Sequence, residues 1–445
     1  MSRLKKDIQL TLLSRIPVML LSFMSVVFLT RLLGPIGNGV YTFTYAVLNL
    51  FTTVIGFQLD SSLTVFLARE KASKGAVFSA IGALSILSLL TFGIIMTLLV
   101  FLIPHGSDWV LPEGQPVRFF FVFMILAFIL RRVSTLMQSI LRGSFKFKSY
   151  NAYLIAGQLM PTLVYGTLLF LSVSKTSPLA ITESFKIILL VELSVACLGR
   201  ILVASQKLIS FSPGFRPWIG PVANLSWNSL LSSVGHYLNK RLDVWFVQFY
   251  RGTATLGQYG LATQIANFVS DAMSPFNQVL IPYVAEASPE QHSPIVQRTA
   301  RLNMGMALVA ALTIAGTSWF FIPLFFGHAF RDAIPATQIL AIGIIFISQR
   351  LVFSGYFKAI NRMEFAVKAA WSGVVITVIL DVLLIPMYGI AGASLATTLA
   401  YATTSTYLVL TAKRLLGFSF RDIFLVRKSD ITWLLSRKTS EEHTM

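Results

Sequence analysis

Apolar runs of about twenty residues recur along the whole chain, each long enough to cross the ~30 Å hydrocarbon core of a bilayer as a helix. Short segments carrying glycine, proline and charged residues separate them. Lipid offers no partners to backbone N–H and C=O groups, so only helices and closed barrels span it, and these runs are too long and uniformly apolar for barrel strands. The sequence therefore predicts an all-α polytopic membrane protein.

Composition supports this prediction, because only 12% of the residues are charged and 55% are hydrophobic. A soluble domain carries about a quarter charged residues. We expect about twelve membrane spans. They are residues 10–33, 39–60, 76–103, 117–140, 150–173, 180–204, 222–249, 256–283, 301–326, 334–358, 366–386 and 388–411.

A glycine-proline turn joins the first two predicted spans, within residues 30–41. Glycine supplies unusual backbone angles there, and proline fixes its own. Arg31 lies where the first helix would leave the hydrocarbon. A weaker copy of the stretch follows at residues 251–259, beginning with Arg251. A helix end with a cation and a glycine turn thus occurs once in each half.

One constant shift of 218 residues aligns the second half of the chain with the first, which indicates an internal repeat. The shift pairs Gly39 with Gly257, Tyr41 with Tyr259, Asn49 with Asn267, Arg132 with Arg350, Phe147 with Phe365, and Leu198-Gly199 with Leu416-Gly417. Six spans per repeat is an even number, so both copies have the same orientation. Their axis should lie along the membrane normal, as in known transporters.

Four regions are predicted from this repeat. Residues 1–204 form an N-terminal six-helix lobe and residues 222–415 a C-terminal one. Residues 205–221, rich in proline and glycine, form a cytoplasmic linker between the lobes. Residues 416–445 mix aromatic and basic side chains and form a cytoplasmic tail at the membrane surface.

The net charge of +18 reflects membrane topology rather than nucleic-acid binding. With the N-terminus inside, most Lys and Arg residues fall in cytoplasmic segments or at their membrane ends, which is the positive-inside bias. Both termini are then cytoplasmic. The single cysteine, Cys197, lies in a predicted span and excludes a disulfide framework.

Ionisable residues within spans cost roughly 2.5–3.5 kcal/mol at mid-helix, so they usually face a cavity or a partner. Lys240 and Asp243 are three residues apart and share a helical face. They form either a cationic site tuned by a carboxylate or a self-neutralised pair beside a snorkelling Arg241. Arg15 and Arg31 bracket the first span, where each either contacts a phosphate through its planar fork or snorkels. The candidate substrate-binding cations are Arg15, Arg31, Lys240, Arg241 and Arg251.

The acidic residues within spans are candidates for coupling to H⁺ or Na⁺, or for salt bridges to neighbouring helices. Glu192 and Asp271 fall near the middle of their spans, whereas Asp60 and Asp381 lie nearer the ends. The candidate coupling or pairing residues are Asp60, Glu192, Asp243, Asp271 and Asp381.

Several enzyme classes lack their sequence signals. The five histidines have no metal-ligand spacing, and neither a phosphate-binding Gly-Lys-Ser/Thr loop nor a nucleophile elbow occurs. We therefore expect no catalytic residue, metal or resident cofactor.

Four segments resemble the polysaccharide-transporter branch of the multidrug/oligosaccharidyl-lipid/polysaccharide exporters, which includes the Wzx-type O-antigen flippases. They are RLLGPIGNGVY (31–41), LRGSFKFKSY (141–150), LGQYGLATQIANF (256–268) and DVLLIPMYGIAGASLATTLAY (381–401). The resemblance covers the chain through about residue 415. It implies two six-helix lobes around a V-shaped central cavity that rock between inward- and outward-open states.

The resemblance also implies a cargo, an oligosaccharide on undecaprenyl pyrophosphate that is turned from the inner to the outer leaflet of the bacterial inner membrane. Such units serve O-antigen, capsule or exopolysaccharide assembly, with polymerase and chain-length proteins as further partners. The nearest rival is a multidrug cation antiporter of the same superfamily. An integral-membrane glycosyltransferase or polymerase predicts a large polar loop, whereas the longest outer segment here is residues 105–116.

Overall fold

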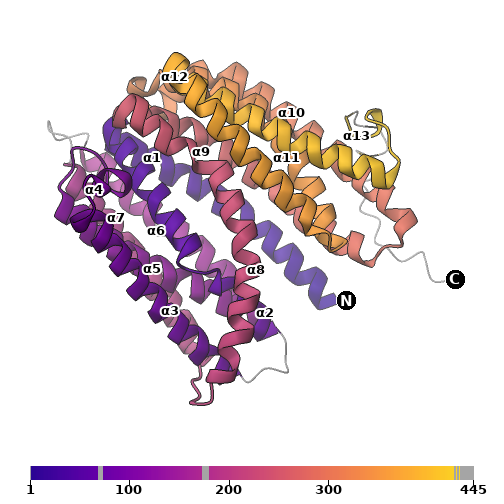
Figure 1. The fold of residues 1–445 in the computed structure, drawn as a ribbon, viewed down its shortest axis with the longest axis horizontal. Coiled ribbons are helices and arrows are strands. Elements are labelled where there is room, and N and C mark those ends of the chain that lie inside the picture. The colour runs from indigo at the N-terminus through magenta and orange to yellow at the C-terminus, as the bar shows by residue number, and fades with distance from the viewer. Residues whose placement is uncertain (1, 69–73, 173–179, 425–426, 428–429, 431–445) are drawn as a thin grey trace.

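The computed structural model describes residues 2–68, 74–172, 180–424, 427 and 430, and the regular structure within them is helical (Figure 1). The first half contains α1 (Ser2–Val54), α2 (Leu59–Ala68), α3 (Lys74–Thr97) with a π-helical end (Leu98–Leu102), α4 (Gly106–Val110), α5 (Val117–Gly143), α6 (Phe147–Ser172) and α7 (Ile181–Ser205). The second half contains α8 (Arg216–Arg241), α9 (Asp243–Glu286), α10 (Pro289–Phe326), a 3₁₀ turn (His328–Phe330), α11 (Ala333–Ala359), α12 (Met363–Leu416) and α13 (Arg421–Phe424).

Three of the long helices change direction at a glycine. The breaks lie at Gly34 in α1 (φ 62°), Gly252 in α9 (φ 78°) and Gly389 in α12 (φ 58°). Only glycine adopts such positive φ values readily. In the part of the chain that the structure describes, eight helices are long and apolar enough to span a membrane. Because α1 and α12 each hold two crossings, and the less apolar α8 and α9 supply two more, the described residues make the predicted twelve.

The helices form two lobes, α1–α7 (the N-lobe) and α8–α12 (the C-lobe). In Figure 1 the lobes lie close together at the top of the view and diverge toward the bottom. The helix α8 runs between the two diverging lobes, and its first turns pack on the N-lobe. There the ring of Trp218 lies 5.9 Å from that of Phe66, and the Ser226 and Ser62 hydroxyls are 2.8 Å apart. The regular helix thus begins inside the predicted linker 205–221.

Beside the Gly34 and Gly252 turns, the lobes meet through two glycines in a reciprocal contact. A Cβ atom added to Gly39 would lie 1.8 Å from the Thr253 carbonyl oxygen, and one added to Gly257 would lie 1.8 Å from that of Pro35. Both pairs obey the 218-residue shift, so the contact is symmetric between repeats. Asn38 Nδ2 also donates to Gly257 O at 2.7 Å. The lobes are closed on each other at this end, which we call the turn side.

The positions of the residues on the helices agree with most of the predicted pairings and contradict one. Arg132 on α5 and Arg350 on α11 occupy matching places, as the shift requires. The pairing of Leu198-Gly199 with Leu416-Gly417 is wrong. Gly199 lies inside α7 against the Tyr153 ring, whereas Gly417 ends α12 with φ 68°. The shift shortens near the end of the repeat, because α12 ends at Leu416 as α7 ends at Ser205.

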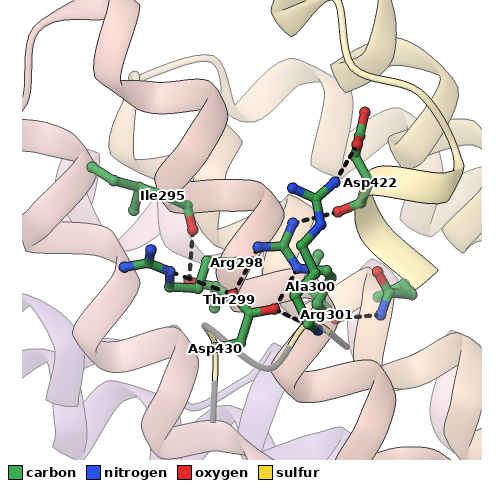
Figure 2. Close-up of polar contacts among 9 residues, drawn as sticks. Ile295, Arg298, Thr299, Ala300, Arg301, Asp422 and Asp430 are labelled. Carbon is green, nitrogen blue, oxygen red and sulfur yellow. Dashed lines mark hydrogen bonds and ion pairs between the residues drawn. The ribbon is translucent and has the colours of Figure 1, made fainter. Parts of the chain in front are cut away.

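In each lobe, the segment that follows the sixth crossing returns to cover the third. In the N-lobe the linker returns to α3, where the Ser212 N–H donates to Ser79 Oγ at 3.0 Å. In the C-lobe the tail returns to α10, the repeat mate of α3. There the buried Asp430 carboxylate accepts two hydrogen bonds from Arg301, at 2.6 and 2.8 Å (Figure 2).

This tail contact is held by further polar groups. Arg301 Nη1 donates to the Asp422 carbonyl oxygen at 2.7 Å, and the Arg427 N–H donates to Asp430 at 3.0 Å. Hydrogen bonding from Arg301 holds the pKa of Asp430 below its usual range. We call this cluster the tail clasp. Residues 431–445 of the predicted tail lie outside the described residues.

Candidate functional site

A polar cavity of about 580 Å³ lies within the N-lobe, between α1, α5, α6 and α7. The C-lobe contributes Arg241 from α8 and Gln264 from α9 to its wall. The polar lining comprises Ser22, Ser25, Thr30, Asn38, Tyr41, Thr42, Tyr45, Asn49, Thr52, Arg131, Ser134, Thr135, Gln138, Gln158, Tyr165, Glu192, Arg241 and Gln264. Such a lining of hydroxyls, amides and a few charges suits a polar ligand, since it replaces the hydrogen bonds the ligand loses on leaving water.

Four side chains from three helices form a connected network in this cavity. Tyr45 Oη donates to Glu192 Oε1 at 2.8 Å, and Arg131 Nε lies 3.8 Å from the same oxygen. Arg131 Nη1 donates to Asn49 Oδ1, and its guanidinium stands 4.9 Å over the Tyr45 ring. Glu192, predicted as a coupling or pairing residue, is therefore paired with a cation.

Arg131 is the cavity residue that the sequence analysis missed. Its place toward the inner end of the span 117–140, next to Arg132, groups it with the cytoplasmic-end cations rather than with the charges inside spans. The structure points the two arginines differently. Arg131 faces the cavity, and Arg132 is buried beside Gly56, in the turn between α1 and α2. The available signal was that Arg131 lies well inside the predicted span, where a charge calls for a partner.

A second, much smaller pocket lies in the C-lobe. It has a volume of about 10 Å³, roughly the space of one water molecule. Its lining includes Lys240, Asp243, Thr263, Asn267, Thr397 and Tyr401. Asp243 Oδ2 accepts hydrogen bonds from Tyr259 Oη and from Thr397 Oγ1, the latter at 3.1 Å. The pocket therefore centres on a buried carboxylate.

The predicted cluster on the seventh crossing lies between these two sites. The helix α8 ends at Arg241 and α9 begins at Asp243, with a tightened turn at Leu242. Lys240 and Asp243 share the C-lobe pocket, as their spacing predicts. Arg241 instead faces the N-lobe cavity, while its Nη1 donates to Thr263 Oγ1 at 3.4 Å. One short segment thus supplies charge to both sites.

Asp381 on α12 belongs with Asp243. It is fully buried, and within the described part of the chain neither of its carboxylate oxygens has a hydrogen-bond partner. The two carboxylates are close enough for their charges to repel each other. Buried carboxylates with free oxygens favour a proton or a cation, because an uncompensated buried charge is costly.

Arg31 on α1 and Arg251 on α9 lie elsewhere, and each contacts the end of a helix in the C-lobe. Arg31 donates to the Leu324 carbonyl oxygen near the end of α10. Arg251 donates to the carbonyl oxygens of Ile385 at 3.1 Å and Pro386 at 2.6 Å, just before the α12 break. The last carbonyls of a helix lack partners within it, and a cation there is favourable. Both arginines are exposed and outside the cavity wall.

The remaining predicted residues are also outside both pockets. Arg15 is half-buried on α1, closer to the N-terminus than the cavity residues Ser22 and Ser25. Asp60 is half-buried in the first turn of α2 and attracts Arg132. Asp271 is exposed on α9 and attracts Lys240.

Two parallel six-helix repeats, closed at one end and holding a polar cavity, define a two-lobed polytopic membrane protein. Comparison with known proteins agrees with this class. The chain belongs to the polysaccharide biosynthesis protein family, whose pattern matches residues 4–288. The resemblance drawn from the four sequence segments is thereby confirmed.

Two archaeal relatives match most of the chain. A protein described as the probable low-salt glycan biosynthesis flippase Agl15 of Haloferax volcanii is 25% identical, over 86% of this chain and 78% of the relative. An uncharacterised membrane protein of Methanocaldococcus jannaschii is 21% identical, over 80% of this chain and 74% of its own length.

Solved structures share the fold. A multidrug resistance MATE family transporter of the MOP superfamily, in an inward-facing conformation, has a TM-score of 0.73 at 13% identity and covers 90% of this chain and 95% of its own. The lipid II flippase MurJ, in an inward closed conformation, has a TM-score of 0.64 at 15% identity, covering 93% and 91%. At these identities the likeness establishes the architecture of two six-helix lobes.

Proposed function

We propose that this protein is a flippase, which carries undecaprenyl-pyrophosphate-linked oligosaccharide repeat units from the inner to the outer leaflet by alternating access. It would reside in the bacterial cytoplasmic (inner) membrane with both termini in the cytoplasm and supply O-antigen, capsule or exopolysaccharide assembly. The observation that carries the proposal is the polar N-lobe cavity of a chain in the polysaccharide biosynthesis family. The relative described as a glycan biosynthesis flippase supports it.

The physics of the cargo fits this cavity. Each polar group of a glycan headgroup that entered hydrocarbon without a partner would cost ~2–7 kcal/mol. The hydroxyls and amides of the cavity replace that lost hydration, and Arg241 on its wall offers a planar fork for phosphate oxygens. The lipid tail stays in the bilayer. An inside-negative potential assists export by ~2.3 kcal/mol per negative charge per 100 mV.

The way the lobes meet supports the proposal of alternating access. They are closed at the turn side by the reciprocal contacts of Gly39 and Gly257, and they diverge at the opposite side (Figure 1). With the N-terminus inside, this arrangement is an inward-facing state that admits cargo from the inner leaflet. The rocking that opens the turn side would separate these two glycines and release the cargo outward.

We assign ion coupling to the C-lobe pocket. Asp243 and Asp381 are buried, repel each other and keep oxygens without partners in the described residues. A single H⁺ or Na⁺ held there would remove the repulsion and favour one state of the lobe. We assign Arg31 and Arg251 to holding helix ends, while substrate contact falls to Arg241. Polysaccharide polymerase and chain-length proteins would receive the exported unit.

Charge reversal in the cluster tests the proposal. Arg241→Glu and Lys240→Glu should abolish export of surface polysaccharide in cells deleted for this gene, while the protein remains in the membrane. Arg118→Glu, which changes an exposed arginine at the start of α5, serves as the matched control and should export normally. Full export by both reversed variants would count against the model, and drug resistance in place of glycan export would favour a multidrug antiporter.

A further inference from the structure

The N-lobe cavity holds a set of groups that the transport proposal leaves without a specific task. Tyr41, Tyr45 and Tyr165 line it together with Glu192 and Gln264. The rings of Tyr41 and Tyr45 lie 4.4 Å apart, and Tyr41 is half-buried at the cavity wall. A volume of about 580 Å³ is in the range of ~300–1,000 Å³ seen for pockets that enclose small ligands. The question is which chemistry this set recognises.

Among the described residues, two buried acceptor atoms in the cavity wall lack partners, as does the Thr42 hydroxyl. Glu192 Oε2 and Gln264 Oε1 are buried, and neither has a hydrogen-bond partner among the described residues. The Arg131 guanidinium, in contrast, is already engaged by Asn49 and Glu192. A buried acceptor left unpaired costs free energy, so the cavity favours a ligand that brings donors. Hydroxyl groups are such donors, whereas a carboxylate or phosphate would only add acceptors.

Charge argues against a cationic ligand in the same place. The ionisable groups facing the cavity from its helices are Arg131, Arg241 and Glu192, so the lining is net positive. Arg131 also occupies the Tyr45 ring face, at 4.9 Å, which a ligand cation would otherwise use. An uncharged, hydroxyl-rich ligand with one apolar face fits what remains. The ring face of Tyr41 suits the C–H side of a sugar, and the acceptors suit its hydroxyls.

We propose that the N-lobe cavity is a carbohydrate subsite, in which an uncharged pyranose packs against Tyr41 and donates hydroxyl hydrogen bonds to Glu192 and Gln264. This inference rests on the proposed function, because it assigns one part of the cargo to one lobe. Arg131 is a positioning residue that holds Glu192 and Asn49 in place. Arg241, at the wall next to the C-lobe, is left for the phosphates that join the sugar to its lipid.

Saturation-transfer NMR with free sugars tests the subsite without any transport. The protein is held in lauryl dimethylamine oxide, because a maltoside detergent would compete as a sugar. The probes are D-galactose, D-glucose, N-acetyl-D-glucosamine and D-glucuronate at millimolar concentration, with tetraphenylphosphonium as the cationic probe. Uncharged sugars should give a saturation-transfer signal at their ring protons. D-glucuronate and tetraphenylphosphonium should give no signal that is lost when an uncharged sugar is added.

Four variants show whether the named side chains are responsible. Tyr41→Leu removes the ring and Glu192→Gln removes the charged acceptor, and each should weaken sugar binding about tenfold. Tyr41→Phe should keep binding, because the ring face remains. Tyr388→Leu, a change at an exposed tyrosine of α12, should also keep it. Thermal unfolding of each variant shows that the fold is intact.

The results separate this inference from the proposed function. Three results would overturn the subsite. They are no signal from any uncharged sugar, signals from the Tyr41→Leu and Glu192→Gln variants equal to those of the unmodified protein, and displacement of sugar by tetraphenylphosphonium. If cells deleted for this gene then still recover surface polysaccharide from the intact chain, the flippase stands and only the subsite is lost. If export is not restored but the sugars bind as described, the subsite stands and the flippase proposal falls.

Discussion

The N-lobe cavity and the C-lobe pocket are built from repeat-related positions but enclose very different volumes, about 580 and 10 Å³. The shift of 218 residues takes Tyr41 to Tyr259 and Asn49 to Asn267. Tyr41 is at the wall of an open space, whereas the Tyr259 hydroxyl is bonded to a carboxylate in a filled one. One helical frame thus leaves a large polar space in one lobe and a nearly filled space beside a buried carboxylate in the other.

The residues that correspond to Lys240 and Asp243 in the N-lobe explain the difference between the two spaces. Lys240 and Asp243 correspond to Ser22 and Ser25, which line the N-lobe cavity. Arg131 in turn corresponds to Gln349, which is buried and donates to the Ala300 carbonyl oxygen at 3.1 Å. At these three positions each lobe carries a charge where the other carries a neutral residue, whereas Arg132 and Arg350 are charged in both. The two spaces therefore differ through a few substitutions at equivalent positions.

The largest effect is expected where the lobes are alike. Gly39→Ala and Gly257→Ala each place a Cβ atom against a backbone carbonyl oxygen, and we expect each to lower export about tenfold or more, by an equal amount. Surface polysaccharide in complemented cells measures export, and labelling of a cysteine at the turn side measures closure. Gly93→Ala, on α3 in open space, is the control. Unequal defects would contradict the symmetric contact.

The next effect separates the lobes. Asp243→Asn and Asp381→Asn should remove the dependence of export on a Na⁺ or H⁺ gradient, because the paired charges that hold the ion are gone. Sugar binding in the N-lobe should be unchanged by both. Glu192→Gln should instead weaken sugar binding and leave the dependence of export on the gradient unchanged. Export and saturation-transfer NMR are measured on all three variants. A variant that changed both readouts equally would contradict two separate sites.

A smaller effect concerns stability and compares the two tyrosine mates. Tyr259→Phe removes a hydrogen bond to a buried carboxylate and should lower the free energy of unfolding by ~1.5–3 kcal/mol. Tyr41→Phe should cost less, since no carboxylate depends on its hydroxyl in the same way. Thermal unfolding in detergent measures both. An equal loss of stability would mean that Tyr41 is bonded as tightly as its mate.

The smallest effect on export is expected from the tail clasp, which is present only in the C-lobe. Asp430→Asn should expose the tail to protease without lowering export much, because neither Arg301 nor Asp430 lines either pocket. Because Arg301 lowers the Asp430 pKa, the contribution of the carboxylate is complete above the usual aspartate pKa and is lost only as pH falls through the lowered value. Mild acid should therefore leave the tail protected, and protease sensitivity at mildly acidic pH would contradict this.

The architecture could be predicted from the sequence because it depends on local and periodic signals. The length of the apolar runs sets the twelve crossings, and Gly34 and Gly252 mark breaks that need positive φ. Matching residues at one shift reveal the repeat. The failed pairing of Gly199 with Gly417 shows the limit, because a shift fixed early in the repeat does not follow a change in helix length near its end.

The site could be predicted only in part. The spacing of Lys240 and Asp243 places them on one face, and both line the C-lobe pocket. Nothing in the sequence favours Arg241 over Arg31 or Arg251 for the cavity, because tertiary contacts between distant helices decide whether an arginine meets a cavity or a helix end. Glu192 and Arg131 also come together only through packing of α5 on α7.

The reciprocal contact of Gly39 and Gly257 has the form of an isologous interface, in which the same surface serves on both sides of a two-fold axis. A single six-helix lobe therefore carries both halves of the contact and is complementary to its own copy. An ancestral lobe of this kind would have paired as a homodimer before its gene was duplicated and fused. On this view the peptide linker is younger than the turn-side contact, and two halves made as separate polypeptides should still assemble.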